Sequence, residues 1–354
     1  MKRTSGIILG VAALAFGVSV SLNTSAGAVP AHRVNAEAVL GVEQLDGKVS
    51  KYPRTLSEYG FFLDAGARQP DARVIPYELN TALYSDGADK LRYIFLPDGA
   101  AMTDTGEGGL LDLPVGSAII KTFAFGEGAD QRYIETRLLL HRADGWLALP
   151  YKWNEEQTEA KLALVGARME LERPDGQTIS YQIPNKNQCK NCHQLNDVVT
   201  PIGPKSRNLS RQWLEARTAE GAIEVLPTVY DTVPHWQARA DNSDTNALAR
   251  GYLDVNCAHC HQPGGSASNS GLDLRWEQQS SYAVGIRKPP VAAGRGAGGH
   301  KVSIAPGDPD ASILVYRMSS TEPGVAMPEL GRSTNDEDGI EVIRRWVEGM
   351  QPAS

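Results

Sequence analysis

Two short segments carry all four cysteines of this 354-residue chain, and both have the same spacing. They lie at residues 189–193 (C-K-N-C-H) and at residues 257–261 (C-A-H-C-H). The pattern C-x-x-C-H is typical of covalent attachment of c-type haem. Two cysteines three positions apart lie on one side of a helical turn, so both can reach the vinyl groups of one porphyrin. The sequence therefore predicts two covalently attached haems c.

The same pattern assigns a role to each of its residues. The cysteines are expected to bond the porphyrin, and the histidine after each pair is expected to ligate the iron from one side. The predicted cofactor-binding residues are Cys189, Cys192, Cys257 and Cys260, and the predicted iron ligands in these motifs are His193 and His261. The second ring nitrogen of such a histidine usually donates to a backbone carbonyl, for which residues 200–204 (T-P-I-G-P) offer a proline carbonyl.

Other uses of four cysteines fit the spacing less well. A redox-active dithiol does not require a histidine directly after each pair. A zinc ribbon separates its two pairs by roughly 15–20 residues, whereas residues 193–256 separate the pairs of this chain. Haem attachment is therefore favoured over zinc or disulfides.

Residues 1–28 have the features of a secretory signal peptide. Lys2 and Arg3 precede an apolar run over residues 6–20, and A-G-A at residues 26–28 fits a cleavage site. The run is shorter than the roughly 18–20 apolar residues that a spanning helix needs. We expect cleavage before Val29, a periplasmic location, and a mature protein with no membrane span.

Charge restricts the class of partner. The formal net charge is −7 at pH 7, and loss of Lys2 and Arg3 would make it −9. Binding to nucleic acid depends on contacts of Lys and Arg with phosphates, so an acidic chain is a poor match for it. We expect a redox partner protein with a basic docking face, and the sequence leaves the electron donor and acceptor open.

The mature chain is long enough for two domains. Residues 29–50 are low in aromatic side chains and are expected to form a linker. Residues 51–185 contain short runs of β-forming residues separated by turn signals. The expected strands lie at residues 91–96, 118–125, 132–140, 146–153, 161–165 and 178–183. This pattern predicts a β-rich, sandwich-like domain that carries no catalytic residue.

Residues 186–354 change to helical and loop-rich patterns. Asp244 or Thr245 is expected to begin a helix that leads into Cys257, and residues 334–337 (T-N-D-E) match a capping box before a terminal helix. In a small c-type cytochrome, the first and last helices pack together around the haem. The predicted fold class is therefore α+β, with the β-rich domain followed by a mainly α-helical dihaem cytochrome region.

Each iron also needs a partner on its far side. Met327, directly before Pro328, is the predicted ligand of the second haem, because a thioether stabilises ferrous iron and raises the potential. His259, inside the second motif, is expected to be a surface residue. For the first haem the sequence leaves five alternatives open: Met318, His235, His300, His141 or no ligand.

Longer strings outside the motifs are more specific than the motifs themselves. They lie at residues 79–90, 134–139, 153–158, 187–193, 256–261, 288–296 and 327–332. Through these strings the chain resembles a family of exported bacterial dihaem c-type cytochromes, known mostly as conserved hypothetical proteins. The resemblance implies two covalent haems and electron transfer outside the cytoplasm, and it implies no settled substrate.

The leading prediction is a periplasmic electron-transfer protein with two haems. One alternative is a dihaem peroxidase-like oxidoreductase, which needs an iron with an open far side and an acid–base residue above it. Such enzymes carry their motifs on two similar domains, whereas His193 and His261 are close in this sequence. A haem-based sensor or binding module is a further alternative.

Overall fold

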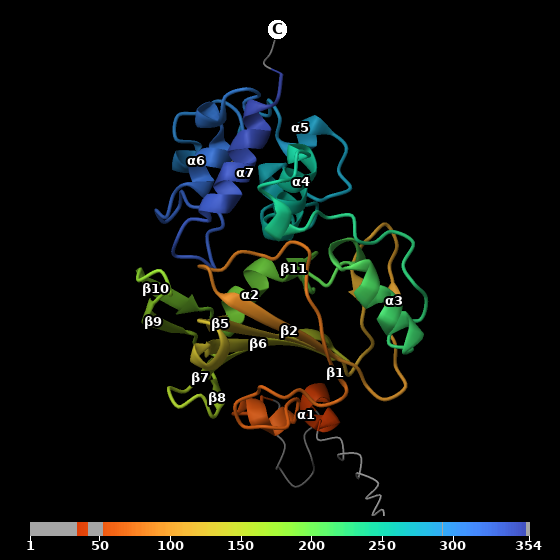
Figure 1. Ribbon diagram of the computed structural model, residues 1–354. Helices are drawn as coiled ribbons and strands as arrows, with labels where there is room; N and C mark the ends of the chain where they lie inside the picture. Colours follow the sequence, from red (N-terminus) through yellow and green to blue (C-terminus); the bar gives the residue numbers. More distant parts are fainter. Residues whose placement is uncertain (1–33, 42–51, 292, 352–354) are drawn as a thin grey trace, which may run out of the picture. The chain divides into compact units, whose positions relative to one another are not determined.

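The computed structural model describes residues 34–41, 52–291 and 293–351 (Figure 1). The expected signal peptide, residues 1–28, lies outside the described residues. Within the described part of the chain, no helix has both the length and the apolar character that crossing a membrane requires. Residues 36–40, inside the expected linker, form helix α1 (Ala36–Leu40), which packs against the sheet described next.

A six-stranded antiparallel sheet forms the centre of the β-rich region (Figure 1). Its strand order is β1-β2-β5-β6-β7-β8. The strands span Val74–Pro76 (β1), Asp89–Phe95 (β2), Ala118–Phe125 (β5), Arg132–Arg142 (β6), Gly145–Trp153 (β7) and Ala160–Leu162 (β8). A hairpin follows, made of β9 (Ala167–Glu172) and β10 (Thr178–Ile183). Every expected strand overlaps an observed one, so these predictions are confirmed. The strands β1 and β9 and the two-residue strands β3 (Thr103–Asp104) and β4 (Leu111–Asp112) were missed.

Both faces of the sheet are buried, but a second large sheet covers neither of them. One face packs against α1 and against Tyr59 and Phe61, and the Tyr59 hydroxyl lies 3.0 Å from that of Tyr151. The other face meets helices α2 (Lys186–Cys192) and α3 (Arg211–Ala219). An apolar sheet face needs a partner layer, and helices, loops and the small β9–β10 hairpin provide it here. The expectation of a sandwich-like domain is therefore wrong.

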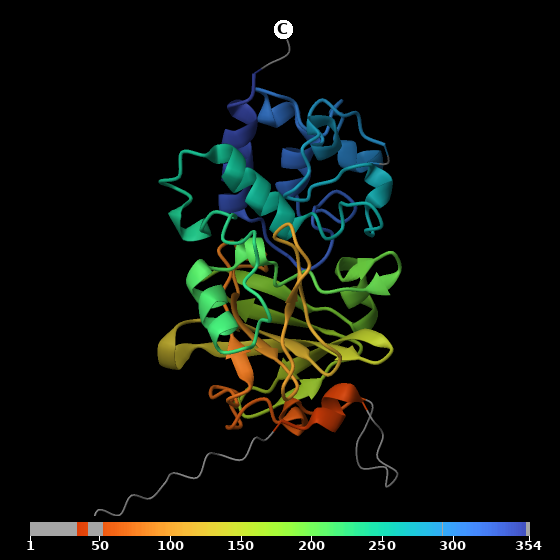
Figure 2. The ribbon, with the colours of Figure 1, turned by 90° about the vertical axis from the view of Figure 1, so that its right-hand side faces the viewer.

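Helix α4 (Thr245–Asn256) packs against the terminal helix α7 (Glu337–Glu348), as Figure 2 shows. The indole Nε1 of Trp346 donates to Oδ1 of Asn246 over 3.0 Å. The side chain of Asp244 caps α4, as expected. Asp336, and not the Thr334 capping box, caps α7 by accepting from the amide of Gly339.

The prediction of a mainly α-helical region after residue 185 is wrong. Its longest helices, α4 and α7, have 12 residues each, and α5 (Ser281–Val284) and α6 (Ile313–Met318) are only one or two turns long. Irregular chain connects them, and the fold is dominated by the sheet. Glycines with positive φ, such as Gly264 and Gly271, interrupt these segments, and a left-handed backbone cannot continue a helix.

Two buried carboxylates join the sheet region to the helical region. Asp254 of α4 accepts from Lys205 and from Arg207, which belong to the chain that packs on the sheet. Asp86, in the loop before β2, accepts from the amides and hydroxyls of Ser333 and Thr334, just before α7. These contacts fix the two regions around the cysteine motifs.

Candidate functional site

The first motif is held on the sheet by helix α2. Asn185 and Gln188 form a reciprocal capping box: each side chain accepts from the other residue's amide, at 2.8 and 3.0 Å. Cys189, in the middle of the helix, is buried in the apolar cluster that also contains Leu139 of the sheet. The sheet therefore fixes one cysteine of the pair, and Cys192 at the end of the helix is less enclosed.

A two-residue hairpin orients His193. The strands β11 (Gln194–Leu195) and β12 (Val198–Val199) pair directly after it, and Nδ1 of His193 lies 3.1 Å from the carbonyl oxygen of Thr200. The amide of Thr200 donates back to the carbonyl of His193 over 2.8 Å. The acceptor is therefore a backbone carbonyl in the expected segment, but it belongs to Thr200 and not to a proline.

The second motif follows helix α4. Cys257 caps the C-terminus of the helix, and the chain turns through Cys260 to His261. Nδ1 of His261 lies 3.0 Å from Oγ of Ser270, which itself donates to the carbonyl of Ala267. Because the hydroxyl proton of Ser270 is used in that bond, its oxygen is left to accept from His261.

Both histidines are therefore held as the tautomer that a metal ligand needs. A carbonyl oxygen can only accept, so Nδ1 of His193 carries the proton and Nε2 keeps its lone pair. The same holds for His261. Burial lowers the pKa of His193 well below its usual range and the pKa of His261 to about 4, so both rings are neutral at pH 7.

The two motifs lie against each other, although the sequence separates them widely. The carbonyl of Asn191 accepts from Oγ of Ser266 over 2.7 Å and from Sγ of Cys260 over 3.5 Å. The amide of Asn196 donates to the carbonyl of Gly264 over 2.9 Å. These contacts join the loops beside the two motifs, so the two pairs of cysteines lie in one region of the protein.

One cysteine from each motif joins His259 in a cluster that the sequence did not predict. The ligand atoms of Cys192, His259 and Cys260 all lie within 4.8 Å of one another. The two thiols share a hydrogen bond, which raises the pKa of Cys192 and lowers the pKa of Cys260. His259 was expected at the surface, but it is partly buried, and its Nδ1 has no hydrogen-bond partner.

A cavity of about 170 Å³ adjoins this cluster. Cys192 and His259 line one side, and the charged side chains of Lys205, Arg207 and Glu277 line another. Lys205 and Arg207 are the residues that bind Asp254, so the cavity lies where the sheet region meets α4.

Met327, the predicted far-side ligand of the second haem, lies in the loop between α6 and α7. Its amide donates to the carbonyl of Arg317 over 3.0 Å, and its carbonyl accepts from Arg332 over 2.9 Å. Its side chain is partly buried. The backbone of this methionine is thus fixed beside α6, while Met318 at the end of α6 is buried in the core with α4 and α7.

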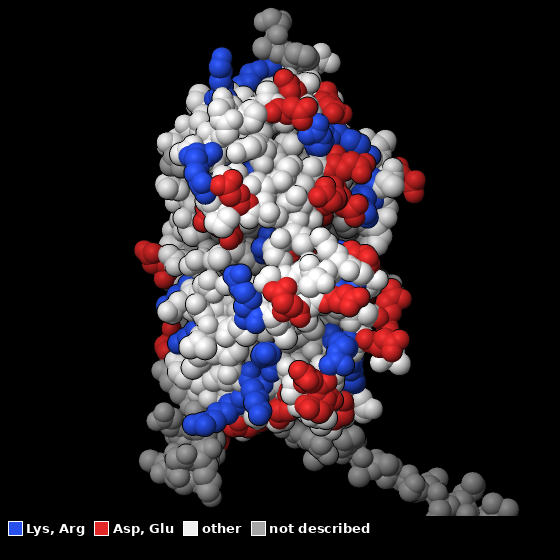
Figure 3. Space-filling model, turned by 90° about the vertical axis from the view of Figure 1, so that its left-hand side faces the viewer, with Lys and Arg blue, Asp and Glu red and all other residues white. Residues whose placement is uncertain are grey.

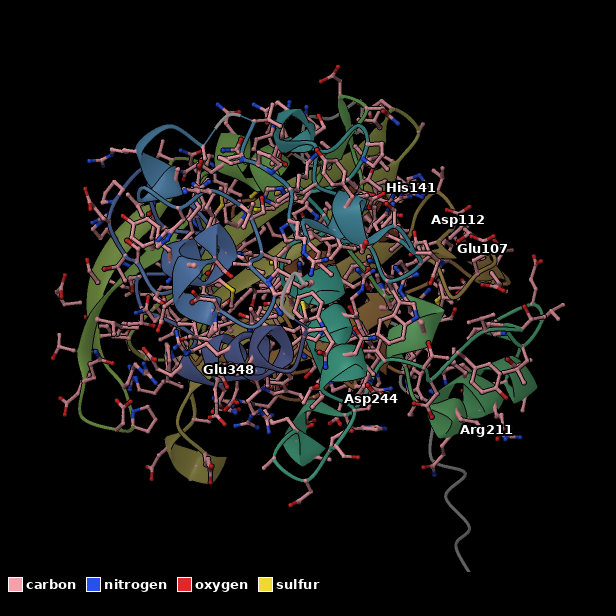
Figure 4. The ribbon with its side chains drawn as sticks, turned by 90° about the horizontal axis from the view of Figure 1, so that it is seen from above. Glu107, Asp112, His141, Arg211, Asp244 and Glu348 are labelled. Atoms are coloured by element: carbon pink, nitrogen blue, oxygen red, sulfur yellow. The ribbon has the colours of Figure 1, made fainter. Side chains whose placement is uncertain are left out.

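The three histidines weighed for the first haem lie in different surroundings. His141 of β6, labelled in Figure 4, donates from Nδ1 to the carbonyl of Leu113 over 2.6 Å. Its ring also stacks on that of Trp146. His235 is largely exposed, with Nε2 3.7 Å from a carboxylate oxygen of Asp231. The ring of His300 packs against that of Tyr316.

The donor set fits two kinds of centre. Each motif offers two free thiols and one neutral imidazole whose Nε2 is available, which is what a c-type haem requires. Cys192, His259 and Cys260 offer two thiolates and one imidazole, a set that suits zinc with a fourth position left over. The two are mutually exclusive, because a cysteine sulfur bonded to a porphyrin is no longer a thiolate.

Sequence reasoning missed the residues that support the motifs. Thr200 contributes only its backbone, and Ser270 lies nine positions after His261 with no recognisable pattern between them. The asparagine carbonyl that joins the motifs, at Asn191, carries no side-chain signal either. In comparisons with known proteins, no family model, no curated protein and no solved structure matches the chain.

Proposed function

We propose that this chain is an exported dihaem c-type cytochrome that transfers electrons in the periplasm. One observation carries the proposal. In both C-x-x-C-H motifs the histidine is neutral, its Nδ1 proton is given to an oxygen acceptor, and its Nε2 faces no such constraint. A structural zinc or dithiol site would not need the same arrangement twice.

The cysteines and the histidine of each motif have different roles in this proposal. Cys189 and Cys192 would hold the first haem, and Cys257 and Cys260 the second. A bound haem supplies a ferric–ferrous couple that accepts or releases one electron. His193 and His261 would ligate the irons, and their oxygen acceptors fix the ring orientation and raise the basicity of each ligand.

Met327 is the proposed far-side ligand at the second motif. Arg332 supports this role, because one of its terminal nitrogens donates to the backbone carbonyls of Ser320 and Met327, at 2.7 and 2.9 Å. The carbonyl oxygens of Arg317 and Met318 lie within 3.4 Å of the same nitrogen. A loop tied in this way holds the backbone of Met327 while its side chain stays free to bind.

The contact between the motifs supports relay from one centre to the other. Asn191 of the first motif touches Cys260 of the second, so the two attachment sites are direct neighbours. A partner protein would complete the path. On the face drawn in Figure 3, acidic and basic side chains are interspersed.

Mass spectrometry of the mature protein tests the assignment. We expect two haem adducts, one of which disappears in the double variant Cys189→Ala, Cys192→Ala and the other in Cys257→Ala, Cys260→Ala. A protein without adducts, or an adduct count that neither double variant changes, would rule the assignment out.

A second candidate is a single metal ion held by Cys192, His259 and Cys260, and the closeness of their ligand atoms is what favours it. Elemental analysis of the purified protein separates the two candidates. The haem assignment predicts two irons per chain and no effect of His259→Ala on the adduct count. One zinc per chain that is lost in His259→Ala would instead support the single-metal site.

A further inference from the structure

Basic side chains line up on the sheet face beneath the first motif. Arg92 of β2, Lys121 of β5 and Arg137 of β6 are direct cross-strand partners, and we call these three the cation row. Alternation along the strands puts them on the same face as Ile94 and Leu139, which belong to the same buried apolar cluster as Cys189. Like charges directly opposite one another destabilise a sheet, so this arrangement needs a compensating anion.

The described residues supply only part of that compensation. Glu135 accepts from Arg137 over 2.8 and 2.5 Å, and it is the one carboxylate that pairs with the row. One terminal nitrogen of Arg92 donates to the backbone carbonyl of Lys90. The side chain of Lys121 has neither a hydrogen bond nor an ion pair with any residue in the described ranges.

The pKa values of the buried lysines on this face reflect the shortage of negative charge. Burial lowers the pKa of Lys121 to about 8, and the charges of Arg137 and Arg92 contribute to the decrease. Lys90, one row further along the same face, has its pKa lowered well below the usual range for the same two reasons. Burying cations without a counter-charge is costly, and here several of them share one face.

The cation row also acts on the first motif itself. Burial raises the pKa of the Cys189 thiol, and the charges of Arg137 and Lys121 oppose that rise. The row shares its face of the sheet with the apolar cluster that contains Cys189, so it lies on the side of the sheet that carries the first motif.

We propose that the cation row binds the carboxylates of the haem attached at Cys189 and Cys192. The inference rests on the proposed function, since a c-type haem brings two propionate groups to the site. Lys121 lies in the centre of the row with its ammonium group unengaged, and Arg92 keeps further donors available on its guanidinium. A free small carboxylic acid has the same chemistry and is the competing source.

The test is the midpoint potential of the first haem in the fully loaded protein. Lys121→Met removes one positive charge at nearly constant volume, so the oxidised iron is stabilised and the potential falls. Lys121→Arg restores the charge and is expected to return the potential toward that of the unchanged protein. The matched control is Lys161→Met, an exposed lysine on the edge strand β8, which leaves the potential unchanged.

Each possible result decides the matter. The inference holds if Lys121→Met keeps both haem adducts, lowers only the first potential, and citrate has no effect on either protein. It fails if the potential does not move, if citrate shifts it in the unchanged protein but not in Lys121→Met, or if the variant alters the axial-ligand signal in electron paramagnetic resonance. A protein with no haem adduct would defeat the proposed function as well.

Discussion

The same five-residue pattern is built on two different supports in this protein. The first motif lies on a helix of 7 residues that the sheet holds in place through Cys189. The second follows a helix of 12 residues whose support is the terminal helix α7. The motif therefore requires no particular scaffold, only a helix end that releases the histidine beside an oxygen acceptor.

The acceptors differ in a way that matters for experiment. His193 donates to a backbone carbonyl, which no substitution can remove, whereas His261 donates to the hydroxyl of Ser270. The nearby cations differ as well. Those at the first motif are strand residues of the cation row, and Arg332 near the second motif uses its donors on carbonyls. The two centres are thus expected to respond separately to substitution.

The largest expected effect comes from removing the buried charge that joins the helical region to the sheet region. Asp254 is fully buried and pairs with Lys205 and Arg207. Asp254→Asn leaves Lys205 without its carboxylate and Arg207 with Glu277 alone, and loss of one member of a buried pair costs about 3–5 kcal/mol. Urea unfolding of the holoprotein measures this loss. The exposed Asp241→Asn is the control, and equal stability of the two variants would contradict the role of Asp254.

Acidic pH is expected to weaken the pairing of Asp254 with Lys205 and Arg207. Burial alone would raise the pKa of Asp254, but Lys205 and Arg207 outweigh it and lower the pKa. The resulting stabilisation is complete above the unfolded-state pKa of about 3.9 and is lost as pH falls through the lower folded-state value. Unfolding free energies at a series of pH values below 5 should decrease less steeply in Asp254→Asn. Parallel curves for the two proteins would contradict this account.

A smaller effect is expected at the second connection. Asp86 accepts four hydrogen bonds from Ser333 and Thr334. Asp86→Ala leaves these donors without a partner, at a cost of about 1–3 kcal/mol. Asp86→Asn keeps an acceptor and tolerates the positive φ at this residue, so it should recover part of the loss. If both variants are as stable as the unchanged protein, the contact does not hold the regions together.

The smallest expected effect concerns the hydrogen bond that orients His261, and it distinguishes the second motif from the first. Ser270→Ala removes the acceptor of His261 and should cost about 1 kcal/mol in stability. It should also raise the midpoint potential of the second haem, because a less basic ligand stabilises the ferric iron less. The first haem keeps its carbonyl acceptor and serves as the internal control. Equal shifts at both haems would show that the acceptors do not act locally.

The strands could be predicted from sequence because β-forming runs and turn residues are local signals. The run over residues 118–125 coincides with β5, and residues 178–183 coincide with β10. What covers the sheet could not be predicted in this way. Helix α2 and helix α3 pack on one face through contacts of residues far apart in sequence, and a strand buried on both faces gives no sign of its partner.

The motif residues were predicted as a site from their spacing alone, but their surroundings could not be predicted. Cross-strand register decides that Arg92, Lys121 and Arg137 are neighbours, and three cations on three separate strands leave no pattern in the sequence. The pairing of Cys192 with Cys260 likewise depends on two loops that meet only in the folded chain. The sequence shows which residue types are present, but it does not show which residues far apart in the chain become neighbours in the fold.

A redox titration followed by optical and electron paramagnetic resonance spectroscopy tests the central claim most directly. The claim is that two separately supported motifs carry two haems that exchange electrons. We predict two one-electron steps, of which Cys257→Ala, Cys260→Ala removes one and leaves the other with the spectrum of a histidine-ligated haem. A protein that shows no haem spectrum, or a single step that this double variant abolishes completely, would contradict it.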